Sequence, residues 1–175
     1  AYFEETATSC RNYYLPYIEQ HTSLKFGRNC RVMEVGCGFG GILSIFAAKG
    51  ATVTGIDIHK PSIETAKTLF AERGLKGTFI CSDIFDYSDT QPYDLIILHD
   101  ALEHIPEKER LMLHLKSFLK ADGLLYLGFP AWQMPFGGHQ QMAKNRIIAN
   151  CPYIHLLPRS LFRLVFRACG EKEST

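Results

Sequence analysis

The chain has 175 residues, of which 46% are hydrophobic and 21% are charged, and its formal net charge is +1. This balance is typical of one globular domain, and it excludes a disordered chain, a collagen-like repeat and a small disulfide-stapled scaffold. The small net charge gives no support to a nucleic-acid-binding protein, and no apolar run approaches the ~20 residues that a membrane span needs. The six cysteines form no CxxC pair, which predicts free thiols in a cytoplasmic protein.

Short apolar runs alternate with helical segments up to residue 130, which predicts an α/β fold with a mostly parallel sheet and helices on both faces. An initial helix is expected over residues 9–24, although Pro16 weakens this prediction. Strands are expected at residues 31–35, 52–56, 78–81, 94–98 and 124–129, and crossover helices at residues 40–49, 61–73 and 106–120.

The alternation stops after the fifth strand. A loop rich in aromatic residues, glycine and proline follows over residues 131–140, and then a short helix at 141–149 and an amphipathic helix at 158–169. We therefore expect residues 1–130 to form a Rossmann-like cofactor-binding domain with an N-terminal helix. Residues 131–175 are expected to form an incomplete cap or lid over the strand ends.

A glycine-rich segment, EVGCGFGG, joins the first predicted strand to its helix at residues 34–41. Glycines let the backbone turn sharply and approach a ligand closely, and the helix N-terminus beyond them offers free amide groups. The segment therefore predicts a nucleotide-like cofactor at the carboxyl ends of the strands. Gly36, Gly38 and Gly41 also satisfy the GxGxxG pattern of dinucleotide-binding proteins, so the glycines alone leave the identity of the cofactor open.

The carboxylate of Glu34 narrows the choice of cofactor. It lies two residues before Gly36 at the end of a buried strand, where a charged group needs a partner. A negative charge at that place would repel the pyrophosphate of a dinucleotide. S-adenosylmethionine fits better, because it carries an ammonium and a sulfonium group and no phosphate.

Two further acids follow the next strands. Asp57 closes the second strand, and its two oxygens can accept hydrogen bonds from both hydroxyls of a ribose; the alternative is a helix N-cap before Pro61. Asp83 follows the third strand and can accept a hydrogen bond from an adenine amino group, while Ile84 covers a face of the ring. The alternative for Asp83 is a turn-forming aspartate.

The segments EVGCGFGG, TGID, CSDIFD and YDLIILHDALEHI together resemble, in order and spacing, the successive motifs of class I S-adenosylmethionine-dependent methyltransferases. The resemblance covers about residues 30–130 and implies a Rossmann-like fold, with S-adenosylmethionine as the methyl donor and S-adenosylhomocysteine as the product. It places Glu34 and the glycine loop near the methionine moiety and Asp57 on the ribose. The residues expected around the cofactor are Glu34, Gly36, Cys37, Gly38, Gly40, Asp57, Ile58, Asp83, Ile84 and His99.

The complete fold of that family has seven strands, of which the last two form a reversed hairpin, whereas only five strands are evident in this sequence. Either the chain is a truncated piece of a longer enzyme, or the cap at residues 131–175 replaces the hairpin, and we favour truncation. The fifth strand would then be an exposed edge, which favours a homodimer or another covering chain.

Methyl transfer to oxygen or nitrogen needs the acceptor held about 3 Å from the sulfonium methyl group and, often, a general base. Two histidines are the candidate bases. His139 lies in the loop after the fifth strand, whose aromatic residues could wall an acceptor pocket or simply complete the core. His104 lies in the LEH segment after the fourth strand, where a structural or cofactor-side role competes with catalysis.

A metal site is a further alternative at the end of the fourth strand. Asp100, Glu103 and His104 would share one face of a helical turn, and with His139 they could hold a divalent metal. The pattern is similar to the metal motif of small-RNA 3′-end methyltransferases. That family carries Glu where Asp100 stands, and this chain lacks a basic RNA surface, so we predict no metal.

The sequence thus predicts a methyltransferase that moves a methyl group to an oxygen or nitrogen of a small polar acceptor, with neither nucleic acid nor a membrane as partner. A non-catalytic S-adenosylmethionine-binding module and an NAD(P)-dependent oxidoreductase are the alternatives. Glu34 and the CSDI and LEHI segments argue against the oxidoreductase. The binding module is left open, because cofactor motifs reveal binding and not chemistry.

Overall fold

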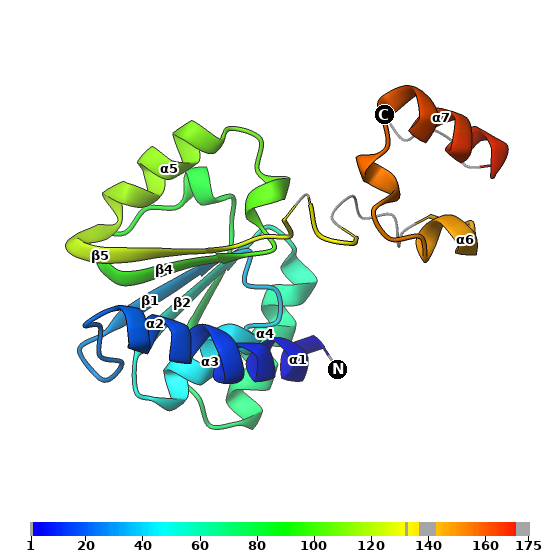
Figure 1. Cartoon of the computed structure of the whole chain (residues 1–175). Coiled ribbons are helices and arrows are strands. Elements are labelled where there is room, and N and C mark those ends of the chain that lie inside the picture. Colours follow the sequence, from blue (N-terminus) through cyan, green and yellow to red (C-terminus); the bar gives the residue numbers. More distant parts are fainter. Residues whose placement is uncertain (1, 132, 137–142, 171–175) are drawn as a thin grey trace. The chain divides into compact units, whose positions relative to one another are not determined.

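The computed structural model describes residues 2–131, 133–136 and 143–170 of the chain. The backbone divides into two compact units, Ala1–Phe129 and Pro130–Thr175. The first unit contains a sheet with helices on both faces, as Figure 1 shows. In the part of the chain that the structure describes, no helix is both long and apolar enough to cross a membrane.

The sheet has five strands, all parallel. The strands are β1 (Arg31–Val35), β2 (Thr52–Asp57), β3 (Thr78–Cys81), β4 (Tyr93–His99) and β5 (Leu119–Gly128). Their order across the sheet is β3-β2-β1-β4-β5, so the order reverses between β1 and β4. The helices of this unit are α1 (Tyr2–Ser9), α2 (Leu15–His21), α3 (Gly41–Ala48), α4 (Lys60–Glu72) and α5 (Lys108–Ser117). In an open parallel sheet, ligands bind at such a reversal, beyond the carboxyl ends of the strands.

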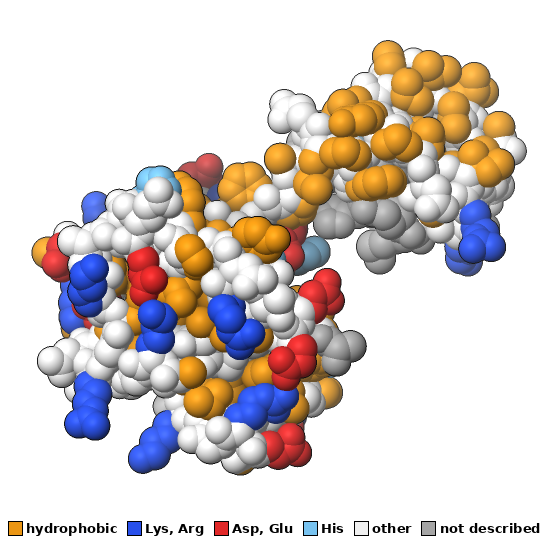
Figure 2. Space-filling model, turned by 60° about the horizontal axis from the view of Figure 1, so that its bottom comes forward, with side chains coloured by type: hydrophobic (Ala, Val, Ile, Leu, Met, Phe, Trp, Pro, Cys, Tyr) orange, Lys and Arg blue, Asp and Glu red, His pale blue; other side chains and the backbone are white. Residues whose placement is uncertain are grey.

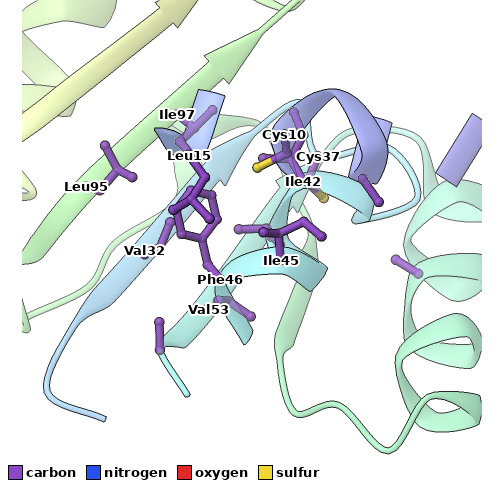
Figure 3. Packing of buried hydrophobic residues seen from close by; sticks show 14 of the residues in the cluster. Cys10, Leu15, Val32, Cys37, Ile42, Ile45, Phe46, Val53, Leu95 and Ile97 are labelled. Carbon is purple, nitrogen blue, oxygen red and sulfur yellow. The ribbon is translucent and has the colours of Figure 1, made fainter. Parts of the chain in front are cut away.

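Buried hydrophobic side chains form one cluster on each face of the sheet, because successive strand residues point to opposite faces. Leu95 and Ile97 of β4 belong to the cluster that α1 to α4 cover, whereas Ile96 and Leu98 belong to the cluster under α5. Figure 3 shows part of the first cluster, where the ring of Phe46 from α3 packs among residues of α2, β1 and β2. The unbroken apolar run of β4 is therefore buried on both faces, as predicted for a central parallel strand.

The first helical stretch is longer than the one predicted over residues 9–24. A π-helical segment, Cys10–Tyr14, joins α1 to α2, and in it the Leu15 N–H donates to the Cys10 carbonyl. Pro16 stands in the first turn of α2. A proline ring lacks an N–H and clashes with the carbonyl four residues before it, so a wider turn ahead of Pro16 relieves the conflict. The proline thus accompanies a π turn and does not end the helix.

The boundary between α5 and β5 also differs from the prediction. The helix expected over residues 106–120 ends earlier, and β5 begins at Leu119, before its predicted start. The register between β4 and β5 shifts between Tyr93 and Leu95, which marks a bulge in the pairing. Ala121–Gly123, which locally favours a turn, lies inside β5 beside this irregularity. Pairing with β4 therefore overrides the local preference of Ala121–Gly123 for a turn.

The second unit keeps apolar side chains on its surface. Its helices are α6 (Arg146–Ala149) and α7 (Arg159–Ala168), and α7 has no buried residue. Leu161 and Leu164 of α7 are exposed, and Figure 2 shows hydrophobic side chains gathered over this unit. The cap or lid role expected of residues 131–175 stays a prediction.

A buried tyrosine hydroxyl secures the amino-terminal end of β4. Tyr93 is fully buried, and its hydroxyl oxygen lies 2.8 Å from Asp89 Oδ2 and 3.2 Å from Thr54 Oγ1. Replacing Tyr93 with phenylalanine removes one hydrogen-bond partner from each of these buried or half-buried groups, so we expect the free energy of unfolding to fall by about 1–3 kcal/mol. Urea denaturation measures this loss. Tyr17→Phe changes an exposed tyrosine and is expected to cost less than about 0.5 kcal/mol. Equal losses of the free energy of unfolding in the two variants would show that the hydrogen bonds of the Tyr93 hydroxyl do not stabilise the fold.

Candidate active site

The glycine loop runs from the end of β1 to the start of α3 and is held against β2. The amide groups of Gly36 and Cys37 both donate to the Ile56 carbonyl, at 2.8 and 3.1 Å. Gly36 has a left-handed backbone with a φ of 75°, and a Cβ atom built there would lie 2.6 Å from the Cβ of Ala101. Only glycine fits at this position, because the loop approaches the segment after β4 so closely.

Glu34 is buried with one carboxylate oxygen unpartnered. Its side chain accepts a hydrogen bond from the Leu43 amide, but its Oε2 has no partner among the described residues. Burial, and then the nearby carboxylate of Asp57, raise the pKa of Glu34 well above its ordinary value. An orphaned buried oxygen of this kind fits a cationic group such as the ammonium of S-adenosylmethionine, and it does not fit a phosphate.

Asp57 ends β2 and bridges the glycine loop to the turn before α4. Its Oδ2 accepts from the Gly38 amide at 2.8 Å, and its Oδ1 accepts from the His59 amide at 2.8 Å. The N-cap position of α4 is held by His59, so the alternative role of Asp57 as the cap of that helix is wrong. Each carboxylate oxygen has more than one lone pair, which leaves acceptor capacity for the hydroxyls of a ribose.

A cavity of about 470 Å³ opens beside the carboxyl ends of β1 and β2 and the segment after β4. The predicted site residues that line it are Gly36, Asp57, Ile58, Asp83, Ile84 and His104. The predicted cofactor residues that lie outside this lining are Glu34, Cys37, Gly38, Gly40 and His99. The fold thus brings residues from four separate segments to one edge of the sheet, where a parallel sheet places its ligand.

Asp83 forms the turn that was the alternative role considered for it, and its binding of adenine stays a prediction. Its Oδ1 accepts from the Phe85 amide at 2.9 Å, and it caps the 3-10 turn Ile84–Asp86. The same residue lines the cavity together with Ile84. The turn therefore fixes the aspartate where an adenine amino group could reach its carboxylate.

Three side chains that the sequence does not group together meet at the end of β4. The Tyr14 hydroxyl lies 2.7 Å from His99 Nε2, and His99 Nδ1 lies 3.3 Å from Asp100 Oδ2. The ring of Tyr14 also packs against Tyr126 of β5, with centroids 5.7 Å apart. His99 and Asp100 could be placed near a site from their position at a strand end, but no pattern in the sequence signals the contribution of Tyr14.

Tyr2 covers the glycine loop from α1. Its ring meets Phe39 edge-on at 5.8 Å, and a Cβ atom on Gly38 would lie 3.5 Å from Tyr2 Cε1. Burial, and after it the carboxylates of Asp100 and Glu34, raise the pKa of the Tyr2 hydroxyl. The charges of several acidic groups therefore act on the Tyr2 hydroxyl beside the glycine loop, and this negative field favours a cationic ligand.

His139 lies outside the described residues, so its role as a base stays a prediction. Within the described residues, no group of three or more His, Cys, Asp or Glu side chains is arranged to hold a metal ion. The alternative metal site at this strand end also included His139, so the expectation that no metal binds there stays a prediction.

The parallel sheet, the glycine loop after β1 and the acids at the ends of β1 and β2 define a class I S-adenosylmethionine-dependent methyltransferase fold. The chain belongs to the methyltransferase domain family, whose model matches residues 26–172. Membership of this family rules out the alternative of an NAD(P)-dependent oxidoreductase.

Known relatives agree with this assignment. The chain is 39% identical over 114 residues to a ubiquinone biosynthesis O-methyltransferase of Coxiella burnetii, a match that covers 64% of the chain and 47% of the relative. It spans about half the length of the curated relatives that it matches.

Solved structures confirm the predicted fold class. One is an S-adenosylmethionine-dependent methyltransferase from Clostridium acetobutylicum, with a TM-score of 0.60 and 18% identity over 71% of this chain and 49% of that chain. Another is coclaurine N-methyltransferase bound to N-methylheliamine and S-adenosylhomocysteine, with a TM-score of 0.58 and 24% identity over 65% of this chain and 34% of that chain.

Proposed function

We propose that the protein transfers a methyl group from S-adenosylmethionine to a hydroxyl oxygen of a small aromatic acceptor. The observation that carries the proposal is the cavity at the strand ends, with Asp57 and Asp83 in its wall and the unpartnered Glu34 carboxylate nearby. Oxygen is favoured over nitrogen because the curated relatives are named O-methyltransferases of ubiquinone biosynthesis. An aromatic acceptor is favoured because a quinone is the oxidised form of a hydroxylated aromatic ring.

The residues of the chain have separable roles in this proposal. Bound S-adenosylmethionine would supply an activated methyl group, Glu34 would face its ammonium, and Asp57 would bind its ribose. Asp83 and Ile84 would hold the adenine ring at the other end of the cavity. His104 in the cavity wall and His139 stay the candidate bases proposed from the sequence. We also propose a cytoplasmic location, because five cysteines are free thiols, namely Cys10, Cys30, Cys37, Cys81 and Cys169.

Calorimetric titration with S-adenosylhomocysteine tests the cofactor first, with NAD and NADP titrated in parallel. We expect micromolar binding of S-adenosylhomocysteine alone. Transfer of labelled methyl groups to catechols then tests the reaction. Tight binding without turnover of any acceptor would instead support a non-catalytic binding module.

Replacing Asp57 with alanine is expected to weaken the binding of S-adenosylhomocysteine by about 1–3 kcal/mol, roughly 5- to 150-fold, because charged hydrogen bonds to the ribose are lost. Calorimetry measures the change, and a melting curve shows whether the loop that Asp57 holds is still folded. Asp122→Ala removes an exposed aspartate of β5 and is the matched control, with an expected change of less than about twofold. An unchanged affinity of Asp57→Ala for S-adenosylhomocysteine would show that Asp57 does not bind the ribose.

A further inference from the structure

A chain of polar contacts from Tyr14 through His99 ends in the cavity wall at Asp100. Asp100 lines the cavity, and its side chain is 53% exposed, whereas His99 behind it is only 18% exposed. His99 Nδ1 lies 3.3 Å from Asp100 Oδ2. Because a carboxylate accepts hydrogen bonds and donates none, a neutral His99 that faces Asp100 in this way carries its proton on Nδ1. The Nε2 atom of His99 is then an acceptor, and the hydroxyl of Tyr14 donates to it. The chain therefore runs from Tyr14 through His99 to Asp100.

The backbone at Asp100 is held in a sparsely populated conformation. Its φ is 51°, in the left-handed region that non-glycine residues seldom adopt, and its amide donates to the Gly128 carbonyl at 2.9 Å. A Cβ atom on Gly128 would lie 2.7 Å from His99 Cδ2, so a side chain on Gly128 would displace the imidazole. Strain of this kind persists only where the surroundings enforce it, and it is concentrated at functional sites.

The π-helical segment sets the direction of Tyr14. One extra residue in a helical turn rotates everything after it by about 100° relative to a regular α-helix. Tyr14 is the last residue of this segment, and its ring lies 4.8 Å from that of His99. Two irregular backbone features, the π segment and the left-handed Asp100, thus meet in one chain of polar contacts. π-Helical turns are frequent at functional sites for this reason.

One oxygen of the Asp100 carboxylate is left for a ligand. His99 takes Oδ2, and among the described residues no donor reaches Oδ1. The exposed side chain can therefore accept a proton or a hydrogen bond from a molecule in the cavity. A group held in one orientation by its neighbours loses little freedom when it acts, which is the condition for efficient general-base catalysis.

We propose that Asp100 is the general base of the methyl transfer and that His99 and Tyr14 are positioning residues that fix its carboxylate. The assignment rests on the function proposed above. Asp100 Oδ1 accepts the hydroxyl proton while the acceptor oxygen forms its bond to the methyl carbon, and the carbon–sulfur bond breaks with its electron pair left on sulfur. The protonated Asp100 then returns its proton to water as the methyl ether leaves.

The experiment compares Asp100→Asn, His99→Gln and Tyr14→Phe with the wild-type chain, and uses Tyr17→Phe as the control because Tyr17 is exposed on α2. Three quantities are measured for each protein. These are the affinity for S-adenosylhomocysteine by calorimetry, kcat and KM with 3,4-dihydroxybenzoate as the acceptor probe, and the ¹⁵N resonances of the His99 ring.

We expect Asp100→Asn to lower kcat by about 100-fold or more, with KM and cofactor affinity changed by less than about threefold. His99→Gln and Tyr14→Phe are expected to lower kcat by about tenfold each, and Tyr17→Phe by less than about twofold. The ¹⁵N spectrum of the wild-type chain should show the proton of His99 on Nδ1, and Tyr14→Phe should shift only the Nε2 resonance strongly.

Three results would overturn the assignment. Turnover of Asp100→Asn within about threefold of wild type would remove Asp100 as the base. A loss of cofactor affinity above about tenfold with unchanged kcat would make Asp100 a cofactor ligand instead. A His99 proton on Nε2 would reverse the hydrogen-bonded chain. If the wild-type chain binds the cofactor but methylates no probe, the proposed acceptor class fails, and the ¹⁵N spectrum alone then decides whether the chain of hydrogen bonds exists.

Discussion

Replacing Gly36 with alanine is expected to lower methyl transfer by about 100-fold and to destabilise the fold. The new methyl group would lie 2.6 Å from the Cβ of Ala101, whereas carbon atoms pack at about 3.5–4.0 Å. Either the glycine loop or the segment after β4 must therefore move by about 1 Å, and both line the cavity. Because the site holds its reactants in a fixed geometry, a displacement of that size lowers the rate by about two orders of magnitude. Calorimetry with S-adenosylhomocysteine and turnover of a catechol measure the effect.

Gly74→Ala is the matched control for this variant. Gly74 also has a left-handed backbone, with a φ of 63°, but a Cβ atom there would meet nothing within 4 Å. Both substitutions carry the backbone cost of about 1–2 kcal/mol, and only Gly36→Ala adds the collision with Ala101. We expect Gly74→Ala to melt at a lower temperature but to bind the cofactor like wild type. Equal cofactor affinities in the two variants would show that the glycine loop does not depend on its contact with Ala101.

The centre of the sheet could be predicted from the sequence because its signals are local. β1 and β3 begin and end at the predicted residues, β2 is one residue longer at its end, and β4 is one residue longer at each end. Apolar runs bounded by glycine or proline carry this information without reference to the rest of the chain. The same topology then brings Asp57 and Asp83 to one cavity wall, because parallel strands end at the same edge.

The parts that could not be predicted depend on contacts between distant residues. Tyr14 and His99 are 85 positions apart, and their meeting requires a π segment that no local pattern announces. The start of β5 depends on pairing with β4, which outweighs the turn preference of Ala121–Gly123. The strained Asp100 likewise needs the Gly128 carbonyl of the neighbouring strand. The sequence therefore predicts the cofactor side of the site but not the contacts of Tyr14 and His99 beside it.

Glu34→Gln is expected to stabilise the free protein at neutral pH while weakening cofactor binding by about tenfold or more. Burial and the carboxylate of Asp57 raise the pKa of Glu34 in the folded state above its unfolded value. The folded protein then holds a proton that the unfolded chain has lost, so stability falls as pH rises from the unfolded value through the folded one. A glutamine has no proton to lose, and the variant should melt a few degrees higher at pH ~7 and at the same temperature near pH ~4.

Binding of the cofactor should release the proton that Glu34 holds in the free protein. A cationic ammonium beside Glu34 favours the carboxylate, so S-adenosylhomocysteine should bind the wild-type chain with release of a proton and with an affinity that rises with pH. Calorimetry in buffers of different ionisation enthalpy measures this proton, and Glu34→Gln should release none. Glu64→Gln, which changes an exposed carboxylate of α4, should match wild type in stability and binding. Absence of proton release by the wild-type chain would mean that Glu34 is already ionised in the free protein, and the unpartnered Oε2 would then have to be satisfied by water rather than kept for the cofactor.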